Sequence, residues 1–193
     1  SPRIGGAAYF INADSWGDEA QQTFLKIAEE NPDCVDLGGR RIIKPQGDSE
    51  PAREGTAIGE YLSEMIRQGT ETPNFGVNAT NGYFVNDDMK FYARETYRDV
   101  LASAQGNQIE TEERIDWMAD STTIRGQFDI SFVVGNTLHV EDLKYGWGIV
   151  DVKQNWQLIG YAIGQHKRLL TKGIYIDNVV FRIHQPRAYH PEG

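Results

Sequence analysis

Three charged residues within four positions, Glu141, Asp142 and Lys144, interrupt a segment that otherwise has the composition of a buried strand. Successive side chains of a strand point to opposite faces, so Asp142 and Lys144 share one face and Glu141 lies on the other. The preceding segment, GQFDISFVV, also has strand character, and the Gly135–Asn136 pair between the two is typical of a hairpin turn. Such a hairpin brings Asp129 beside Asp142, and two carboxylates then converge next to an ammonium group.

This grouping indicates a particular chemistry. Two neighbouring carboxylates repel each other, and a buried charge is costly unless it is paired. Mg²⁺ compensates such a pair because it takes oxygen ligands, keeps several waters and commonly bridges one or two carboxylates to a substrate phosphate. A lysine at this position can orient or deprotonate a water for attack on phosphorus, while the cation stabilises charge on the phosphoryl oxygens. A structural ion cluster without catalytic function is the alternative interpretation.

Hydrophobic periodicity and turn residues predict the elements that carry these side chains. Within GQFDISFVV, alternation places Gln127, Asp129 and Ser131 on the face opposite the phenylalanines. The second of four expected helices starts after Ser49 and ends before Gly69. Helices are predicted at residues 14–30, 50–68, 87–105 and 152–173, and strands at residues 108–118, 126–134, 137–145 and 178–186, with connections at residues 70–90 and 119–125. This order predicts an α/β (α+β) fold with a mixed central sheet flanked by helices.

The ordered motifs match a known family. GQFD, then VEDLK, then QLIGY on the next predicted helix resemble the motifs of the PD-(D/E)XK nuclease superfamily, in its RecB-like exonuclease branch. The resemblance extends to the upstream segment AREGTAIGEYLSEMI and to phage-encoded members of that branch, and it covers roughly residues 50 to 187. It implies a restriction-endonuclease-like sheet and a metal-dependent DNA nuclease, an exonuclease of phage-type recombination, repair or host takeover.

The resemblance also implies roles for individual residues. It makes Asp129 and Asp142 metal ligands for Mg²⁺ or Mn²⁺, adds the backbone carbonyl of Leu143 as a third ligand, and makes Lys144 catalytic. Because Glu141 lies on the opposite face, we expect it to be solvated or paired elsewhere, and Glu141→Ala to leave substantial activity.

The two flanking helices carry further candidate site residues. Gln157 and Tyr161 lie at i and i+4 on one helix face, where the resemblance implies that they position DNA or the lysine. An ordinary polar helix edge is the alternative for this pair. Gly59 stands where many RecB-like nucleases have a metal-binding histidine, and the adjacent Glu60 is either a substitute ligand or a solvated side chain. The sequence leaves open whether the site binds one metal ion or two.

The charge distribution bears on how DNA would be bound. The net charge is −9, which argues against a general polyanion-binding protein, but the C-terminal region is locally basic. Trp147, between two glycines, is expected either to stack on a base or to pack against a helix. The basic residues expected to meet phosphates are Lys153, Lys167, Arg168 and Arg182, with Arg40 and Arg41 as weaker candidates.

Length and composition set the remaining expectations. With 193 residues the chain is expected to form a single nuclease-like domain, with an N-terminal extension at 1–48 and the core at 49–187. A C-terminal continuation beyond this chain is left open. The single cysteine, Cys34, excludes an internal disulfide and a cysteine-ligated iron–sulfur cluster. The lack of a long apolar run predicts a soluble, intracellular protein with no membrane contact. The resemblance implies a phage-encoded protein in the cytoplasm of a bacterial host cell.

The predicted partners are DNA, either single- or double-stranded, and a recombination or replication protein. Two other functions stay open. One is a catalytically weakened nuclease-fold module that binds DNA or a protein partner, which the glycine at position 59 would tolerate. The other is hydrolysis of a different phosphate ester. The sequence does not decide polarity, or exonuclease against endonuclease action.

Overall fold

The computed structural model describes residues 9–12, 22, 26, 34–38, 49–119, 121–152 and 155–188. The helix predicted at residues 14–30 lies outside this part of the chain except for Gln22 and Lys26, which are helical. Arg40, Arg41 and Lys153, three of the expected DNA-contacting residues, also lie outside it.

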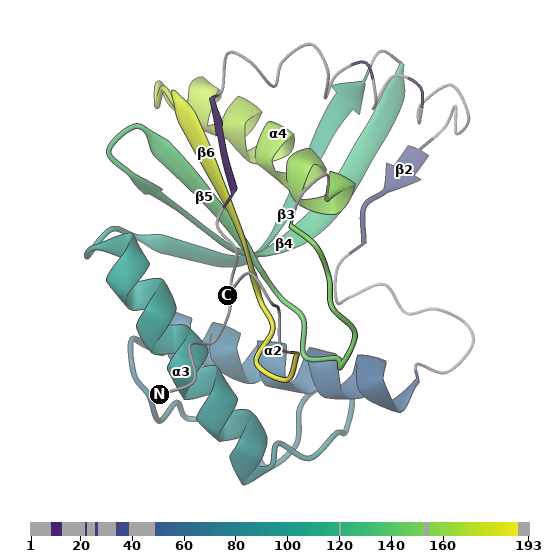
Figure 1. Ribbon diagram of the computed structural model, residues 1–193, viewed down its shortest axis with the longest axis vertical. Helices are drawn as coiled ribbons and strands as arrows, with labels where there is room; N and C mark the ends of the chain where they lie inside the picture. Colours follow the sequence, from purple (N-terminus) through teal and green to yellow (C-terminus); the bar gives the residue numbers. More distant parts are fainter. Residues whose placement is uncertain are drawn as a thin grey trace.

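The described strands form one mixed sheet in the order β1-β6-β5-β4-β2, with β3 paired to β4 (Figure 1). Neighbouring strands are antiparallel for β1–β6, β5–β4 and β4–β3, and parallel for β6–β5 and β4–β2. The strands are β1 Tyr9–Asn12, β2 Cys34–Asp36, β3 Ile109–Ala119, β4 Thr122–Val134, β5 Thr137–Leu143 and β6 Asn178–His184. The predicted mixed sheet is confirmed, whereas the connection predicted at 119–125 is wrong, because β4 already begins at Thr122.

Three helices are described in full: α2 Glu50–Gln68, α3 Asp87–Ala104 and α4 Trp156–Thr171. Their ends follow from capping chemistry. Asn86 and Asn155 cap α3 and α4 by accepting backbone N–H groups three residues ahead, and Gly69 ends α2 in the left-handed conformation, with φ 63°. Ser49 occupies the predicted N-cap of α2 but makes no side-chain capping hydrogen bond.

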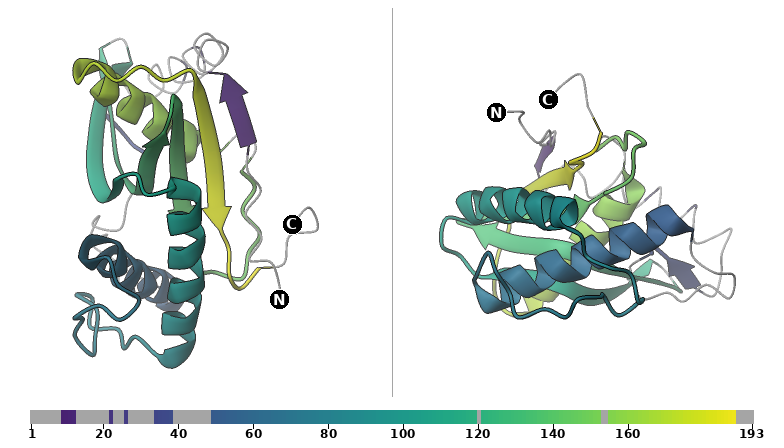
Figure 2. Two further views of the ribbon diagram at one scale, coloured as in Figure 1. Left: turned by 90° about the vertical axis from the view of Figure 1, so that its left-hand side faces the viewer. Right: turned by 90° about the horizontal axis from the view of Figure 1, so that it is seen from below.

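The helices cover the sheet from two sides, each over its own hydrophobic core (Figure 2). Under α4 lies a core that includes Ile124, Phe128, Leu138 and Val140. A second core joins α2 and α3 to Ile130, Phe132 and Leu143. None of the helices in the described part of the chain has an apolar stretch long enough to cross a membrane.

The alternation of β4 changes phase at Asp129, which corrects the sequence-based assignment of faces. Phe128 packs into the core under α4, whereas Ile130 packs into the core under α2 and α3. The β3–β4 ladder skips the pair of Glu112 and Asp129, although residues on both sides are in register. Glu112 has a left-handed backbone, with φ 56°, which is uncommon for a residue other than glycine. The sheet is therefore irregular at the predicted metal ligand.

Candidate active site

Asp129 lies at a fork in the sheet. Along one edge of β4, β3 pairs over almost the whole length of the strand. Along the other edge, β5 pairs with residues 130–134 and β2 with residues 123–125. Backbone hydrogen bonds continue the β2 edge as far as Gln127, whose N–H donates to the Gly38 carbonyl at 3.1 Å. Residues 128–129 of β4 therefore face a gap where β5 and β2 separate. The end of a strand pair leaves backbone groups and side chains available for binding, and both predicted acidic ligands are next to this gap.

The carboxylate of Asp129 reaches across the fork to β5. Its Oδ2 accepts a hydrogen bond from the backbone N–H of Leu143 at 2.8 Å, one residue beyond Asp142. The N–H and C=O of one strand residue point toward the same edge, so the Leu143 carbonyl also faces the Asp129 side. The last paired residues are Ile130 and Glu141, which puts Asp129 and Asp142 opposite each other at the next step of the register. The predicted convergence of these groups is thus present.

Lys144 connects the acidic pair to α4. Its Nζ lies 2.8 Å from Oδ2 of Asp142 and donates a hydrogen bond to Oε1 of Gln157 at 3.2 Å. Asp129 and Asp142 are 8% and 4% exposed, so their charges sit where water screens them poorly. The ammonium group compensates part of this buried negative charge. Four predicted residues therefore form one connected group.

Gln157 and Tyr161 bind a backbone segment that the sequence did not place at the site. Gln157 Nε2 donates to the carbonyl of Leu37 at 2.7 Å, and the Tyr161 hydroxyl donates to the carbonyl of Gly38 at 3.1 Å. Burial, followed by the charges of Asp142 and Asp129, raises the pKa of the Tyr161 phenol, which keeps it a proton donor. Both side chains join α4 to residues following β2, and Tyr161 is buried rather than on a solvated helix edge.

A glycine of β4 makes the Tyr161 contact possible. A Cβ on Gly126 would lie 2.6 Å from Cε1 of Tyr161, which is closer than real contacts allow. The ring therefore lies directly on the backbone of β4 near the fork. Close packing against Tyr161, rather than an unusual backbone conformation, therefore explains why residue 126 is glycine.

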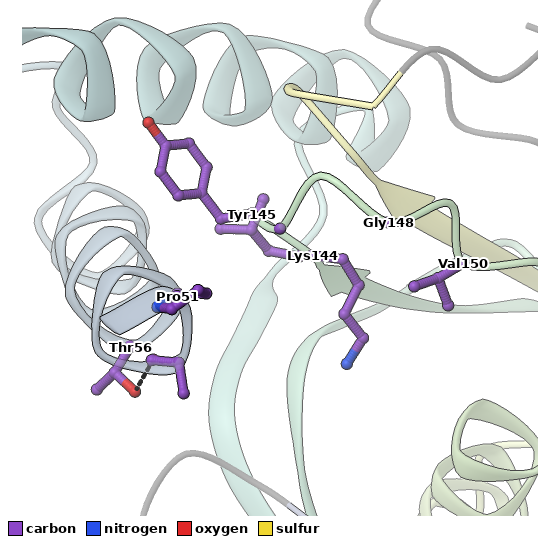
Figure 3. A pocket seen from close by; sticks show the side chains of 10 residues that line it. Pro51, Thr56, Lys144, Tyr145, Gly148 and Val150 are labelled. Carbon is purple, nitrogen blue, oxygen red and sulfur yellow. Dashed lines mark hydrogen bonds between the residues drawn. The ribbon is translucent and has the colours of Figure 1, made fainter. Parts of the chain in front are cut away.

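A pocket of about 280 Å³ opens beside Lys144. Its walls are the first turns of α2 on one side and the chain following β5 on the other. Figure 3 shows Lys144 and Tyr145 pointing in different directions from consecutive positions, with Pro51 and Thr56 of α2 across the pocket. The residues lining it are Pro51, Ala52, Gly55, Thr56, Leu143, Lys144, Tyr145, Gly146, Gly148 and Val150.

The donors at the fork suit a hard cation that retains water. In the part of the chain that the structure describes, no group of three or more His, Cys, Asp or Glu side chains is arranged to hold a metal ion. The fork offers two carboxylates and a strand carbonyl, and Mg²⁺ accepts such a set by keeping several waters. Glu60 is engaged elsewhere, because its carboxylate accepts the backbone N–H of Thr80 at 2.8 Å and also the Thr80 hydroxyl. Its proposed ligand role has no support in this geometry.

Glu141 lies on the opposite face from Asp142 and is paired elsewhere, which is one of the two predicted environments, because it is fully buried beside His184 and Arg182. Its Oε2 lies 2.6 Å from Nε2 of the buried His184, and Arg182 Nη1 is 3.8 Å from its Oε1. Arg182 is further held by Asp99 at 3.1 Å and by Ser103 at 2.8 Å. Arg182, expected to meet DNA, is therefore a counter-ion inside the fold.

The other expected DNA-contacting residues of α4 lie far along the helix from Gln157. Arg168 forms an ion pair with Glu110 and lies over the Phe128 ring. Lys167 is exposed, with its Nζ 5.5 Å from the Trp117 ring centroid. Arg168 comes 11 residues after Gln157 on α4, or about 16 Å along the axis at 1.5 Å per residue. These cations do not converge on the fork.

One cation near the pocket was missed by the sequence analysis. The guanidinium of Arg187 lies 3.6 Å from the Tyr145 ring centroid and 5.2 Å from that of Trp147, and it pairs with Glu54 of α2 at 2.6 Å. Trp147 itself is 74% exposed, so packing against a helix is not its environment. The signal available in the sequence was weak, because Arg187 follows the last strand by three residues and belongs to no motif.

Comparisons with known proteins give one family and one structural likeness. The model of a family described as "Protein of unknown function (DUF2800)" matches residues 43–192. Among solved structures, protein VC1899 from Vibrio cholerae is similar at 16% sequence identity, with a TM-score of 0.24. That match covers 77% of this chain and 43% of the solved one, so the chain spans less than half the length of that protein.

Proposed function

The chain belongs to the DUF2800 family of proteins of unknown function, and we propose that it is a metal-dependent DNA nuclease of the PD-(D/E)XK type, related to RecB-like exonucleases. The observation that supports this most directly is the connected group at the fork. Asp129 reaches the end of β5, and Lys144 is held between Asp142 and Gln157. The three motifs that resemble the nuclease family contribute all four side chains.

Each side chain has a definable task in phosphodiester hydrolysis. A divalent cation such as Mg²⁺ or Mn²⁺, when bound, supplies positive charge to the scissile phosphate. Asp129 and Asp142 provide the negative charge and oxygen donors that attract it, with the Leu143 carbonyl beside them. The Lys144 ammonium orients the attacking water and stabilises negative charge that develops on the phosphoryl oxygens.

Gln157 and Tyr161 are positioning residues in this scheme. Gln157 fixes the Lys144 amine through Oε1 and the Leu37 carbonyl through Nε2, so the lysine is restrained to the fork. Tyr161 holds the neighbouring Gly38 carbonyl and remains protonated. A precisely held lysine matters because misplacement of a catalytic group by about 1 Å can cost about 100-fold in rate.

The biological setting belongs to the same proposal. A DNA substrate places the activity in the bacterial cytoplasm, and a RecB-like exonuclease encoded by a phage acts in recombination, repair or host takeover, alongside a recombination or replication protein. The pocket beside Lys144 gives a DNA strand access to the fork from the side of α2.

End-labelled single- and double-stranded DNA, incubated in Mg²⁺, in Mn²⁺ and in EDTA, tests the proposal. We expect cleavage with either metal and none in EDTA. Lys144→Ala should lower the rate by about 100-fold or more, since a positioned proton-transfer or charge-stabilising group contributes about that much. Lys90→Ala is a matched control, because Lys90 lies on the surface of α3 and pairs with Asp87 there.

Two results would contradict the proposal. One is cleavage that persists in EDTA, and the other is a Lys144→Ala protein that cleaves as fast as Lys90→Ala. DNA binding without cleavage in either metal would instead support the DNA-binding module. Circular dichroism and urea unfolding of each variant separate a lost reaction from a lost fold.

A further inference from the structure

We propose that Trp147 is a stacking platform for an unpaired base, and that the site at the fork therefore takes single-stranded DNA. This inference rests on the proposed nuclease function, because it concerns the strand whose phosphate meets Lys144. The surface consists of the exposed Trp147 ring and the Arg187 guanidinium beside it, at the mouth of the pocket that contains Lys144.

The ring is held from one side and open on the other. Arg187 lies 5.2 Å from the Trp147 ring centroid, within the range of a cation–π contact, and 74% of the tryptophan is exposed. Gly146 and Gly148 flank it, and a Cβ on either would meet nothing within 4 Å. The space beside both glycines therefore leaves room for a base to approach the exposed ring.

The cation that supports the ring is itself fixed. Arg187 is 3.6 Å from the Tyr145 ring centroid and pairs with Glu54 at 2.6 Å. Glu54 also accepts a hydrogen bond from the Tyr83 hydroxyl at 3.2 Å. The platform is thus tied to α2 through a chain of contacts, and its position relative to the pocket is defined. A preorganised aromatic surface binds at a lower cost in entropy than a mobile one.

The distance to Lys144 matches a DNA strand. Trp147 follows Lys144 by three residues, so their Cα atoms are at most about 10 Å apart. Three stacked nucleotides of one strand, at about 3.4 Å each, span about the same length as this Cα separation.

Stacking on an aromatic side chain selects unpaired bases. In a duplex, the faces of a base are covered by its neighbours, whereas in a single strand they are accessible to an aromatic ring. This contact tolerates any base, because every base has a π face, and it suits an enzyme that degrades DNA regardless of sequence. An exposed tryptophan alone would not indicate a base-binding surface; the fixed cation and the adjacent pocket support this interpretation.

Binding measurements on fluorescein-labelled 12-mers test the platform. Single-stranded DNA, a duplex of the same sequence and a fully abasic strand are compared in Mg²⁺ by anisotropy, in the Lys144→Ala protein so that the strand stays intact. Trp147→Ala should weaken binding of the single strand about ten-fold, as expected for loss of one base–aromatic stack, and Trp147→Phe should restore most of it. Tyr175→Ala is the matched control, because Tyr175 is equally exposed, at 76%, between α4 and β6.

The abasic strand separates stacking from charge, because it keeps the phosphates and lacks the bases. We expect Trp147→Ala to leave its affinity unchanged. An equal loss on the abasic strand, no loss on the single strand, or no DNA binding at all overturns the platform. The cleavage assay is independent of this result. If the protein cleaves DNA but Trp147→Ala does not change its affinity, only the platform is refuted. If binding depends on Trp147 but the protein does not cleave DNA, only the nuclease proposal is refuted.

Discussion

Replacing the buried Glu141 by glutamine should destabilise the fold rather than the chemistry. The glutamate is fully buried, next to the buried His184 and near Arg182. Glutamine keeps the size of the side chain and one hydrogen bond to His184, but it removes the negative charge. Arg182 then loses a buried counter-ion, and His184 loses a carboxylate partner. This outcome differs from that expected of a solvated residue, which could be changed at little cost.

The pKa of Glu141 sets the magnitude. Burial by itself would raise this pKa, but the contacts with His139 and His184, and the charges of His184 and Arg182, hold it at about 2 against an ordinary value of 4.5. At 1.36 kcal/mol per pH unit, the difference corresponds to roughly 3 kcal/mol of folding stability. Because the pKa is lower in the folded state, this contribution is fully present above about pH 4.5 and is lost as the pH falls from there toward 2.

Urea unfolding at a series of pH values, followed by tryptophan fluorescence, measures this contribution. Glu141→Gln should lower the free energy of unfolding by roughly 3 kcal/mol at pH 7, and the gap to the unsubstituted protein should narrow below pH 4.5. Glu113→Gln, an exposed glutamate on β3, is the control and should change stability by less than about 0.5 kcal/mol. The reasoning is refuted if Glu141→Gln and the unsubstituted protein have the same free energy of unfolding at pH 7, or if the difference between them stays constant down to pH 3.

The remaining predictions concern the fork and α2. Asp129→Asn should abolish cleavage and raise the Mg²⁺ concentration needed for binding, measured by metal titration, because one of two buried carboxylates is lost. Gly126→Ala should cost about 1 to 3 kcal/mol in urea unfolding, since its Cβ would collide with Tyr161, and equal stability would contradict the close approach. Glu60→Gln should loosen the contact to Thr80, seen as faster local amide exchange, while cleavage keeps its metal dependence.

Local patterns predicted the part of the site built from one hairpin. The register between β4 and β5 follows from the Gly135–Asn136 turn and from alternation, which is a short-range property. The helical i, i+4 spacing likewise placed Gln157 and Tyr161 on one face. Both signals act over a few residues, so the sequence alone was enough to define them.

Contacts between distant segments were not predictable in the same way. Leu37 and Gly38 reach the site through backbone carbonyls, which leave no trace in side-chain types. Arg187 meets Glu54 across 133 positions, and neither residue belongs to a motif. The change of face at Asp129 coincides with the left-handed backbone of Glu112 on β3, a conformation for which a glutamate gives no signal.

The two neighbouring acids of β5 lie on opposite faces of the strand, one inside the fold and one at the proposed active site. Glu141 and Asp142 are adjacent and both buried, yet the alternation of the strand gives them different partners on opposite faces of the sheet. Glu141 contacts His184 and lies near Arg182, whereas Asp142 faces Lys144 at the fork. A one-residue slip of β5 would exchange the two environments and place Lys144 against α3. The buried ion pair behind the site therefore fixes the register on which the proposed chemistry depends.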